Sequence, residues 1–347
     1  MDSMTLLTVL ISRGLFLFSL VTLPVYLLVL YVLIRHRNAD NLDGAFFKFC
    51  VSLGVVDVYS SLNSVVSIHQ LELFTPLHQW GGGPMAKFLL IGIWYCRYSQ
   101  GFAVTFMTVT RFIAVWAPLK ARKLWSPAVV SGCLAFQFAA AGVMVVHMAF
   151  MDIQFLHSPD NATTLPIFAV DNWLVKVTWA NALFAELAFG NAIILLYALT
   201  FYKLWRTGKA SSGQQDTADA GRRQMEVKLA ISGLLIGSLE VVWMVFLFTF
   251  SFLIPKSAPM TYESFYLLYT IVADLYASSN PYILLCLSKA VREKVCEDLG
   301  MEKKNPSLKQ NSAAGGALFV KTSRPVNSQA SSVLASRRNT KVIIERF

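Results

Sequence analysis

The chain contains few charged residues. Asp, Glu, Lys and Arg make up 14% of its 347 residues, against about 25% in soluble domains. The hydrophobic share is 55% and the mean hydropathy is +0.53. This balance excludes a soluble globular domain and predicts an integral membrane protein. The net charge of +10 does not indicate a nucleic-acid partner, because the basic residues are spread unevenly along the chain.

Patterns that carry enzyme chemistry are also missing. The five histidines are scattered without the spacing of a metal site. The sequence has no Gly-x-Ser-x-Gly elbow and no phosphate-binding glycine loop, and Gly81-Gly82-Gly83-Pro84 is typical of a turn. We therefore expect no catalytic activity, no metal site and no cofactor. No repeat relates two halves of the chain, which argues against a transporter built from duplicated bundles.

Long apolar runs are what the chain has in abundance. Seven segments are each apolar over about 20 residues, the length that crosses a bilayer as a helix. They cover residues 14–34, 45–68, 88–115, 127–151, 175–201, 228–254 and 263–287. The expected fold is therefore an all-α membrane protein, a bundle of seven transmembrane helices. The first run lacks a small-residue cleavage site, which indicates a signal anchor rather than a cleaved signal peptide.

The basic residues of the connections predict an orientation. The connections 35–48, 116–126 and 202–228 hold three, three and six Lys or Arg residues. The N-terminus and the three remaining connections hold four in total, Arg13, Lys87, Lys176 and Lys256. Because Lys and Arg are retained in the cytoplasm, we expect an external N-terminus and an internal C-terminus. The glycosylation sequon at Asn161 lies in an outer connection and agrees, although such sequons also occur by chance.

The chain after the seventh run divides into two parts. Val291, Val295 and Leu299 recur at helical spacing within residues 288–299, which predicts a short amphipathic helix along the inner membrane surface. Cys296 on this helix is a candidate for palmitoylation, with an unmodified thiol as the alternative. Residues 300–347 have little apolar content, which predicts a disordered cytoplasmic tail. The expected organisation is a seven-transmembrane domain over residues 1–299 and a tail over residues 300–347.

Short motifs at the ends of two runs point to a family. Thr110-Arg111-Phe112, at the end of the third run, is followed by Pro118 and Lys123-Leu124-Trp125-Ser126, and Asn280-Pro281 lies in the seventh run. In this order, with seven runs and an external N-terminus, the chain resembles a G-protein-coupled receptor. More narrowly, it resembles the nematode serpentine chemoreceptors of the class gamma superfamily, over about residues 15–300.

The resemblance implies a function and several site residues. It implies a chemosensory receptor of the plasma membrane, in a sensory cilium, that binds a small molecule and activates a heterotrimeric G protein. It implies that Arg111 contacts the G protein, and that Asp57 is a sodium-site carboxylate with Asn280 across the bundle and Pro281 in the same switch. The structural alternatives are an Arg111 that only anchors its helix end and a protonated Asp57 that only fixes packing.

The sequence departs from the main receptor class at four places. Thr110 stands where an acidic residue usually precedes the arginine, so the usual locking salt bridge to that neighbour cannot form. Leu284 replaces the second tyrosine of the Asn-Pro-x-x-Tyr pattern. The sixth run has no proline, and the second outer connection has no cysteine. These departures favour a divergent chemoreceptor over an amine or peptide receptor.

Arg97 lies well inside the third run, where a guanidinium needs an inward-facing partner or water. Glu186, Glu240 and Asp274 fall near the middle of their own runs. We expect Arg97 to pair at rest with one of them, Glu240 or Asp274 in first place, and a ligand to compete for the arginine. Replacing Arg97 with alanine would then abolish the ligand response and leave surface expression intact. A purely structural ion pair is the alternative.

Aromatic side chains crowd the outer halves of the runs. Trp and Tyr favour the membrane interface, so most should be belt or packing residues, while others line a cavity. With Asn63 and Gln100, such a cavity would suit a small, largely apolar ligand that carries a carboxylate or a hydroxyl. The candidate ligand site comprises Arg97, Tyr98, Glu240, Trp243, Tyr266 and Asp274.

Two other functions remain open from the residues. A ligand-gated cation channel of the insect odorant-receptor kind also has seven spans, but with the opposite orientation, so the charge bias speaks against it. A small-solute transporter would need a continuous polar path, and the carboxylates inside the runs do not exclude one. A receptor predicts ligand-driven nucleotide exchange on a G protein, which neither alternative does.

Overall fold

A computed structural model describes residues 3–38, 42, 44–67, 75–157, 164–168, 173–210, 217–249 and 262–301. These residues belong to one compact unit, Met1–Glu302. The long helices are α1 (Ser3–Arg35), α2 (Ala45–Ser67), α3 (Thr75–Trp116), α5 (Pro127–Val145), α6 (Trp173–Ala210), α7 (Thr217–Phe248) and α8 (Tyr262–Leu287). The short elements are α4 (Pro118–Leu124), the 3₁₀ turn η2 (Val146–Phe150), the strands β1 (Ile153–His157) and β2 (Thr164–Phe168), and α9 (Lys289–Asp298).

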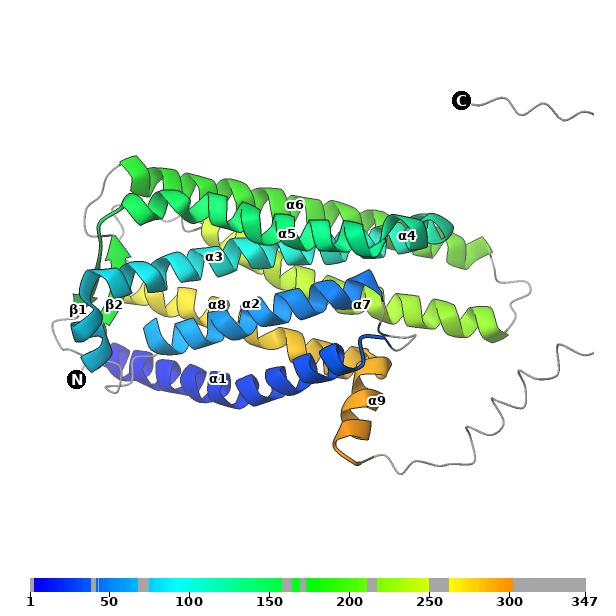
Figure 1. Ribbon diagram of the computed structural model, residues 1–347, viewed down its shortest axis with the longest axis horizontal. Helices are drawn as coiled ribbons and strands as arrows, with labels where there is room; N and C mark the ends of the chain where they lie inside the picture. The colour runs from blue at the N-terminus through cyan, green and yellow to red at the C-terminus, as the bar shows by residue number, and fades with distance from the viewer. Residues whose placement is uncertain are drawn as a thin grey trace, which may run out of the picture. The chain divides into compact units, whose positions relative to one another are not determined.

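Within the described residues, the seven long helices lie side by side as a bundle (Figure 1). α3 is the central helix, since it contacts α2, α5, α6 and α7, while α8 closes the bundle against α1. Over its described residues, each predicted run coincides largely with one long helix, so the seven-helix prediction is confirmed. By length and composition alone, five of the described helices are apolar enough to cross a membrane. α3 and α8 are outside this set, and each carries several polar residues in its interior-facing part, among them Arg97 and Gln100 on α3 and Asp274 and Asn280 on α8.

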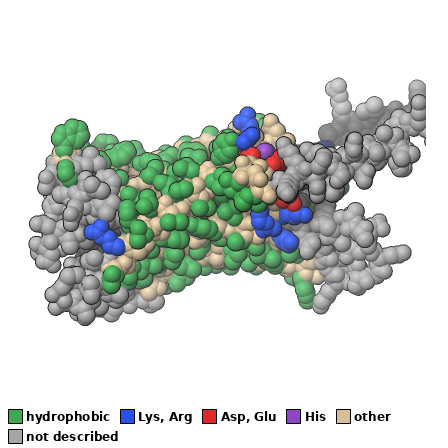
Figure 2. Space-filling view, turned by 90° about the horizontal axis from the view of Figure 1, so that it is seen from below, with side chains coloured by type: hydrophobic (Ala, Val, Ile, Leu, Met, Phe, Trp, Pro, Cys, Tyr) green, Lys and Arg blue, Asp and Glu red, His purple; other side chains and the backbone are tan. Residues whose placement is uncertain are grey.

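The surface of the bundle fits a bilayer. Figure 2 shows hydrophobic side chains over the middle of one face, with Lys, Arg, Asp, Glu and His side chains only near its two ends. Several large apolar side chains of α1 and α6 are exposed, among them Leu17, Val21 and Phe184. In water such a surface would be costly, whereas acyl chains solvate it without penalty.

Some helices extend far beyond the apolar runs. The connection predicted over residues 202–228 is largely helical, because α6 continues to Ala210 and α7 begins at Thr217. The apolar parts of the two helices end near Arg206 and begin at Ala230. Hydropathy therefore shows where the chain leaves the apolar layer and not where its helices end. The prediction that residues 202–228 connect two helices is corrected, because most of this segment belongs to the helices themselves.

The two ends of the bundle differ, and we name them by their elements. At the hairpin end, β1 and β2 form an antiparallel pair with Ile153 opposite Phe168 and His157 opposite Thr164. This pair was not predicted, since two strands of five residues give only a weak pattern beside long apolar runs. Met151 and Ile153 are buried there, and both strands contact α3.

α3 is interrupted near the hairpin end. Gly82 has φ +49° and ψ −141°, a conformation that only glycine adopts without strain, and Pro84 follows it. The turn predicted at Gly81-Gly82-Gly83-Pro84 is therefore a break within α3. The continuous part of the helix that crosses the bundle begins after this break.

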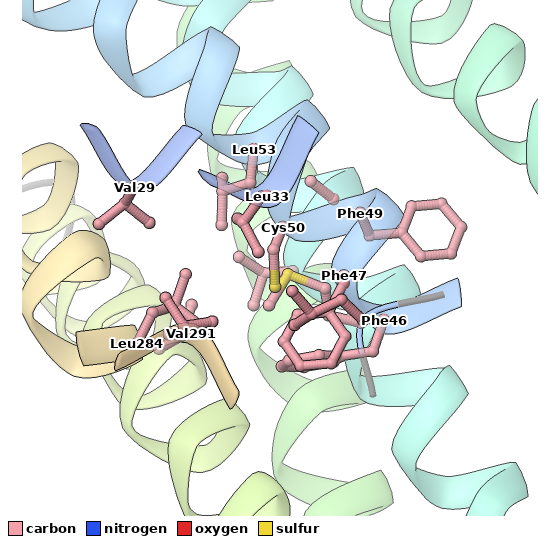
Figure 3. Close-up of a cluster of buried hydrophobic side chains, with 14 of the residues drawn as sticks. Val29, Leu33, Phe46, Phe47, Phe49, Cys50, Leu53, Leu284 and Val291 are labelled. Atoms are coloured by element: carbon pink, nitrogen blue, oxygen red, sulfur yellow. The ribbon is translucent and has the colours of Figure 1, made fainter. Parts of the chain in front are cut away.

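At the α9 end, the predicted short helix is present and packs against α1 and α8. Ser288 caps α9 by accepting a hydrogen bond from the Val291 N–H (3.4 Å). Val291 and Val295 are buried in a cluster that also contains Leu284 and Phe46 (Figure 3). Leu299, predicted on the same apolar face, is 51% exposed because α9 ends one residue before it.

A salt-bridged contact ties α9 to α1. The Asp298 carboxylate lies 3.3 Å from Nη1 of Arg35 and 3.2 Å from Nε2 of His36, and its side chain is 8% exposed. Arg35 ends α1 and His36 follows it, so the last residue of α9 is fixed to the end of α1. The first turn of α9 is fixed by the Ser288 cap directly after α8.

Close approach between α3 and α6 depends on one glycine, which gives a first testable prediction. A Cβ at Gly101 would lie 2.4 Å from Cδ2 of Phe189, a ring buried between the helices. Gly101→Ala should therefore destabilise the fold by about 1–3 kcal/mol, measured as thermal unfolding of the purified chain. Gly132 of α5 is the matched control, because its Cβ would meet no atom within 4 Å and Gly132→Ala should be neutral or stabilising. Equal losses in the two variants would contradict the packing argument.

Candidate functional site

The centre of the bundle holds an arginine with two carboxylates. Arg97 of α3 donates from Nε to Oε1 of Glu186 (2.9 Å) and from Nη2 to Oε2 of Glu186 (2.7 Å). The same Nη2 lies 2.8 Å from Oε1 of Glu240. Glu186 is on α6 and Glu240 on α7. One guanidinium therefore joins three helices, and we call these three residues the Arg97 cluster.

Aromatic rings enclose the Arg97 cluster. The guanidinium carbon lies 4.8 Å from the ring centre of Trp243 and 4.5 Å from that of Tyr276. Arg97 is 6% exposed, Trp243 2% and Tyr276 3%. The rings bring the negative faces of their π-systems to the cation and keep water away from it. The cluster is closed from solvent in this structure.

The close α3–α6 packing helps to set this geometry. Gly101 follows Arg97 by one helical turn, and Phe189 follows Glu186 by about one turn. The missing side chain at Gly101 lets α6 approach α3 at the level where the bidentate Arg97–Glu186 pair forms. The close packing of α3 and α6 thus places the charged groups of Arg97 and Glu186 at a distance where they can form the ion pair.

The predicted pairing of Arg97 needs one correction. Glu240 was a favoured partner and lies against the guanidinium, but Glu186, ranked below Asp274, holds it through two hydrogen bonds. Asp274 instead accepts a hydrogen bond from Ser64 of α2 (2.9 Å). All three carboxylates lie inside the bundle, as expected, but depth along a helix does not reveal which way a side chain faces.

A second polar centre surrounds Asp57 of α2. Gln100 donates to its Oδ1 (2.6 Å), Asn280 donates to its Oδ2 (2.6 Å), and the Tyr26 hydroxyl donates to Oδ2 as well. Asp57 is fully buried. Its carboxylate therefore connects α2 with α1, α3 and α8, and the predicted approach of Asn280 to Asp57 is observed.

This arrangement bears on the expected sodium site. Both carboxylate oxygens of Asp57 already accept hydrogen bonds, and Oδ2 accepts two, so a bound cation would have to compete with these donors for the carboxylate. Pro281 follows Asn280 inside α8 and, having no N–H, leaves the carbonyl of Ala277 without its usual helical donor. The ion and switch roles of these residues remain predictions.

Arg111 lies at the α9 end of α3. Its side chain is buried, and the guanidinium carbon is 3.8 Å from the ring centre of Phe46. Figure 3 shows Phe46 in the apolar cluster at this end of the bundle. A cleft of about 430 Å³ opens beside it, lined among others by Lys48, Thr110, Arg111 and Trp125. Arg111 is thus held by packing at the mouth of a partly polar cleft.

Comparison with known proteins identifies the family. The family described as serpentine type 7TM GPCR chemoreceptor Srv matches residues 15–301. The chain belongs to this family. It is also similar to "Serpentine receptor class V-1" of Caenorhabditis elegans, with 24% identity over 297 residues that cover 82% of this chain and 88% of that protein. The predicted resemblance to nematode serpentine chemoreceptors is confirmed, and the matched region contains all the polar centres described above.

Some predicted site residues of this Srv-family receptor are only partly described. Tyr98 is buried against Trp94, and its hydroxyl has no hydrogen-bond partner among the described residues. Tyr266 lies in α8, but its side chain is outside the described part, as is Asn161. Cys296 lies half-buried on α9 as a free thiol, so its palmitoylation remains a prediction.

The receptor also has a polar network that sequence reasoning missed. Gln137 of α5 is fully buried, accepts a hydrogen bond from Ser52 of α2 (3.1 Å) and donates one to Ser99 of α3 (3.0 Å). A signal existed, since Gln137 is a lone amide within the apolar run Leu134-Ala135-Phe136-Gln137-Phe138. Asn63 and Gln100, which were predicted to suit a ligand, donate hydrogen bonds to the Leu89 carbonyl (3.0 Å) and to Asp57, and their role toward a ligand stays a prediction.

Proposed function

We propose that this chain is a chemosensory receptor that binds a small, largely apolar ligand next to Arg97 and activates a heterotrimeric G protein at the α9 end. The Arg97 cluster is the observation that carries the proposal. One buried cation bridges α3, α6 and α7, so a ligand that alters this contact changes the relation of three helices at once. Such a ligand shifts the bundle only by binding the altered arrangement more tightly.

Aromatic and polar groups near Arg97 support this ligand class. The rings of Trp243 and Tyr276 offer apolar faces, while the Trp243 Nε1 and Tyr98 hydroxyl groups are buried without a hydrogen-bond partner among the described residues. A small molecule with an apolar body and one polar group would satisfy such groups when it enters. Because the cluster is closed, binding requires that α7 or α8 moves away from α3.

The cleft beside Arg111 supports the signalling half of the proposal. When helices separate at the α9 end, Arg111 can leave the Phe46 ring and donate to the backbone carbonyls of an inserted helix. The basic residues Lys120 and Lys123 of α4 lie close in sequence and suit an acidic protein surface. In this proposal the N-terminus is outside the cell and the α9 end is inside, in the plasma membrane.

The decisive test is nucleotide exchange on a purified G protein, driven by agonists found in a screen of small organic compounds. Arg111→Ala should lower agonist-driven exchange by about tenfold or more because the main donor to the inserted helix is lost. Arg111→Lys should be intermediate, since it keeps the charge but not the planar fork. An N-terminal tag stained on unpermeabilised cells controls for expression and orientation. Unchanged exchange in Arg111→Ala would contradict the proposed contact, and an unstained tag would contradict the orientation.

A further inference from the structure

The charges of the Arg97 cluster do not balance. One guanidinium faces the two carboxylates of Glu186 and Glu240, so with all three groups ionised the cluster carries one net negative charge. Glu186 is 1% exposed and Glu240 is fully buried. An uncompensated charge at such a depth is costly, because neither water nor lipid solvates it. The closed bundle needs one more positive charge at this place.

The two carboxylates compete for the same donor. Oε2 of Glu186 and Oε1 of Glu240 lie 2.7 and 2.8 Å from the same Nη2 of Arg97. Glu186 is well held by two hydrogen bonds from Arg97, whereas Glu240 has only its contact with Nη2 and the Tyr276 hydroxyl of α8 beside it. Because both carboxylates contact this one nitrogen atom, the two carboxyl groups lie next to each other. Two acceptors that face one another without a hydrogen between them repel.

The surrounding groups do not supply the missing charge. Tyr98 of α3, Tyr269 and Tyr276 of α8 and Trp243 of α7 face the cluster, and all four side chains are uncharged. Asp57 of α2 interacts with Arg97, and Asp274 of α8 interacts with Tyr269; both are carboxyl groups and cannot supply a positive charge. Among the described residues, the other buried cation is Arg111, which lies 14 positions further along α3, about 21 Å away.

We propose that the Glu186–Glu240 pair binds one proton and shares it between the two carboxyl groups in the closed bundle. The proton comes from bulk water, forms an O–H bond to one carboxyl oxygen and is hydrogen-bonded by the other. The cluster is then neutral, with one positive and one negative charge, and the proton replaces the repulsion between the two carboxyl groups with a hydrogen bond. Interacting carboxyls of this kind titrate as a pair, so the proton belongs to both residues.

The proton is linked to the arrangement of the helices. Glu186 is on α6 and Glu240 is on α7, so a movement that separates these helices separates the two carboxyls. Each carboxyl group is then solvated separately by water or by a ligand group. The carboxyl group that holds the shared proton releases it to the solvent. The closed bundle therefore binds one proton more than an opened one, independently of which ligand or G protein the receptor uses.

The test compares pH dependences of the full chain purified in lipid nanodiscs. Thermal unfolding is followed between about pH 5 and about pH 9, above the range where ordinary carboxyls titrate. Glu240→Gln leaves a neutral cluster that needs no proton. The ratio of the wild-type to the Glu240→Gln folding equilibrium constants should therefore fall about tenfold per pH unit while the pair holds its proton. Glu186→Gln should give the same result by the same charge count, and it keeps the test valid if one variant fails to fold.

An infrared spectrum gives a readout independent of stability. Wild-type protein at neutral pH should show a protonated-carboxyl C=O band that shifts in heavy water and is missing in both Gln variants. Asp57→Asn is the matched control, because it removes another buried carboxyl and should leave both the band and the pH dependence in place. Retention of the band and of the wild-type slope in the two Gln variants would overturn the proposal. Loss of the band and of the wild-type slope in Asp57→Asn would also overturn the proposal, since the proton would then reside on Asp57.

Discussion

Replacing Arg97 with alanine is expected to destabilise the receptor by about 3–5 kcal/mol and to abolish its response. The substitution leaves Glu186 and Glu240 buried without the cation to which both are bound. It also removes the contacts of the guanidinium with the rings of Trp243 and Tyr276. Surface expression should therefore fall together with signalling, unlike the expectation from the sequence, where Arg97 had a single partner.

A rescue variant separates folding from signalling. Combining Arg97→Ala with Glu186→Gln and Glu240→Gln removes every formal charge of the cluster, so most of the lost stability should return while the response stays absent. Lys176→Ala, at an exposed position of α6, should change neither property. Thermal unfolding of the purified variants and cell-surface staining measure the first effect, and nucleotide exchange the second. A rescued triple variant that signals normally would show that the cluster is only structural.

Replacing Asp57 with alanine should destabilise the fold by several kcal/mol, on the order of 1–3 kcal/mol for each buried donor left without an acceptor. Three donors lose their partner at once, namely the Tyr26 hydroxyl and the side-chain amides of Gln100 and Asn280. They come from α1, α3 and α8, so the loss should loosen the contacts of α2 with all three helices. Chemical or thermal unfolding of the purified receptor measures it.

Ser52 on the same helix provides the comparison. Its hydroxyl donates one hydrogen bond to Gln137, so Ser52→Ala should cost only about 1 kcal/mol. Sodium titration of the wild-type chain adds a second readout, because an ion at Asp57 would compete with the three donors bound there and should bind weakly. A loss in Asp57→Ala no larger than that in Ser52→Ala would contradict the idea that one carboxylate holds four helices together.

The sequence was sufficient for the fold because membrane crossings have a strong local signature. Each apolar run is long enough to identify its helix without knowledge of its neighbours. The β1–β2 hairpin and the helical extensions of α6 and α7 were not identified, since neither changes hydropathy in a characteristic way. Strand pairing joins residues 153–157 to residues 164–168, and this pairing is not visible in the composition of either segment.

The candidate site could be predicted only in part. Arg97 was found because a cation within an apolar run is rare, and the proximity of Asp57 and Asn280 followed from the family resemblance. To decide whether Glu186 or Asp274 is the partner of Arg97, one must know the rotation of each helix about its axis. The position of a residue in the middle of a run does not give this rotation. A difference of one or two residues in α6 would turn the carboxylate of Glu186 away from α3 by 100° per residue.

The extension of α7 has a mechanical consequence. The helix begins at Thr217, while its apolar part begins at Ala230, so about 20 Å of helix projects past the apolar layer. A rigid rod of this length works as a lever arm. A tilt of about 10° at the edge of the apolar layer displaces its tip by about 3–4 Å. A small tilt of α7 caused by a rearrangement at Glu240 therefore produces a larger displacement at Thr217, the first residue of the helix.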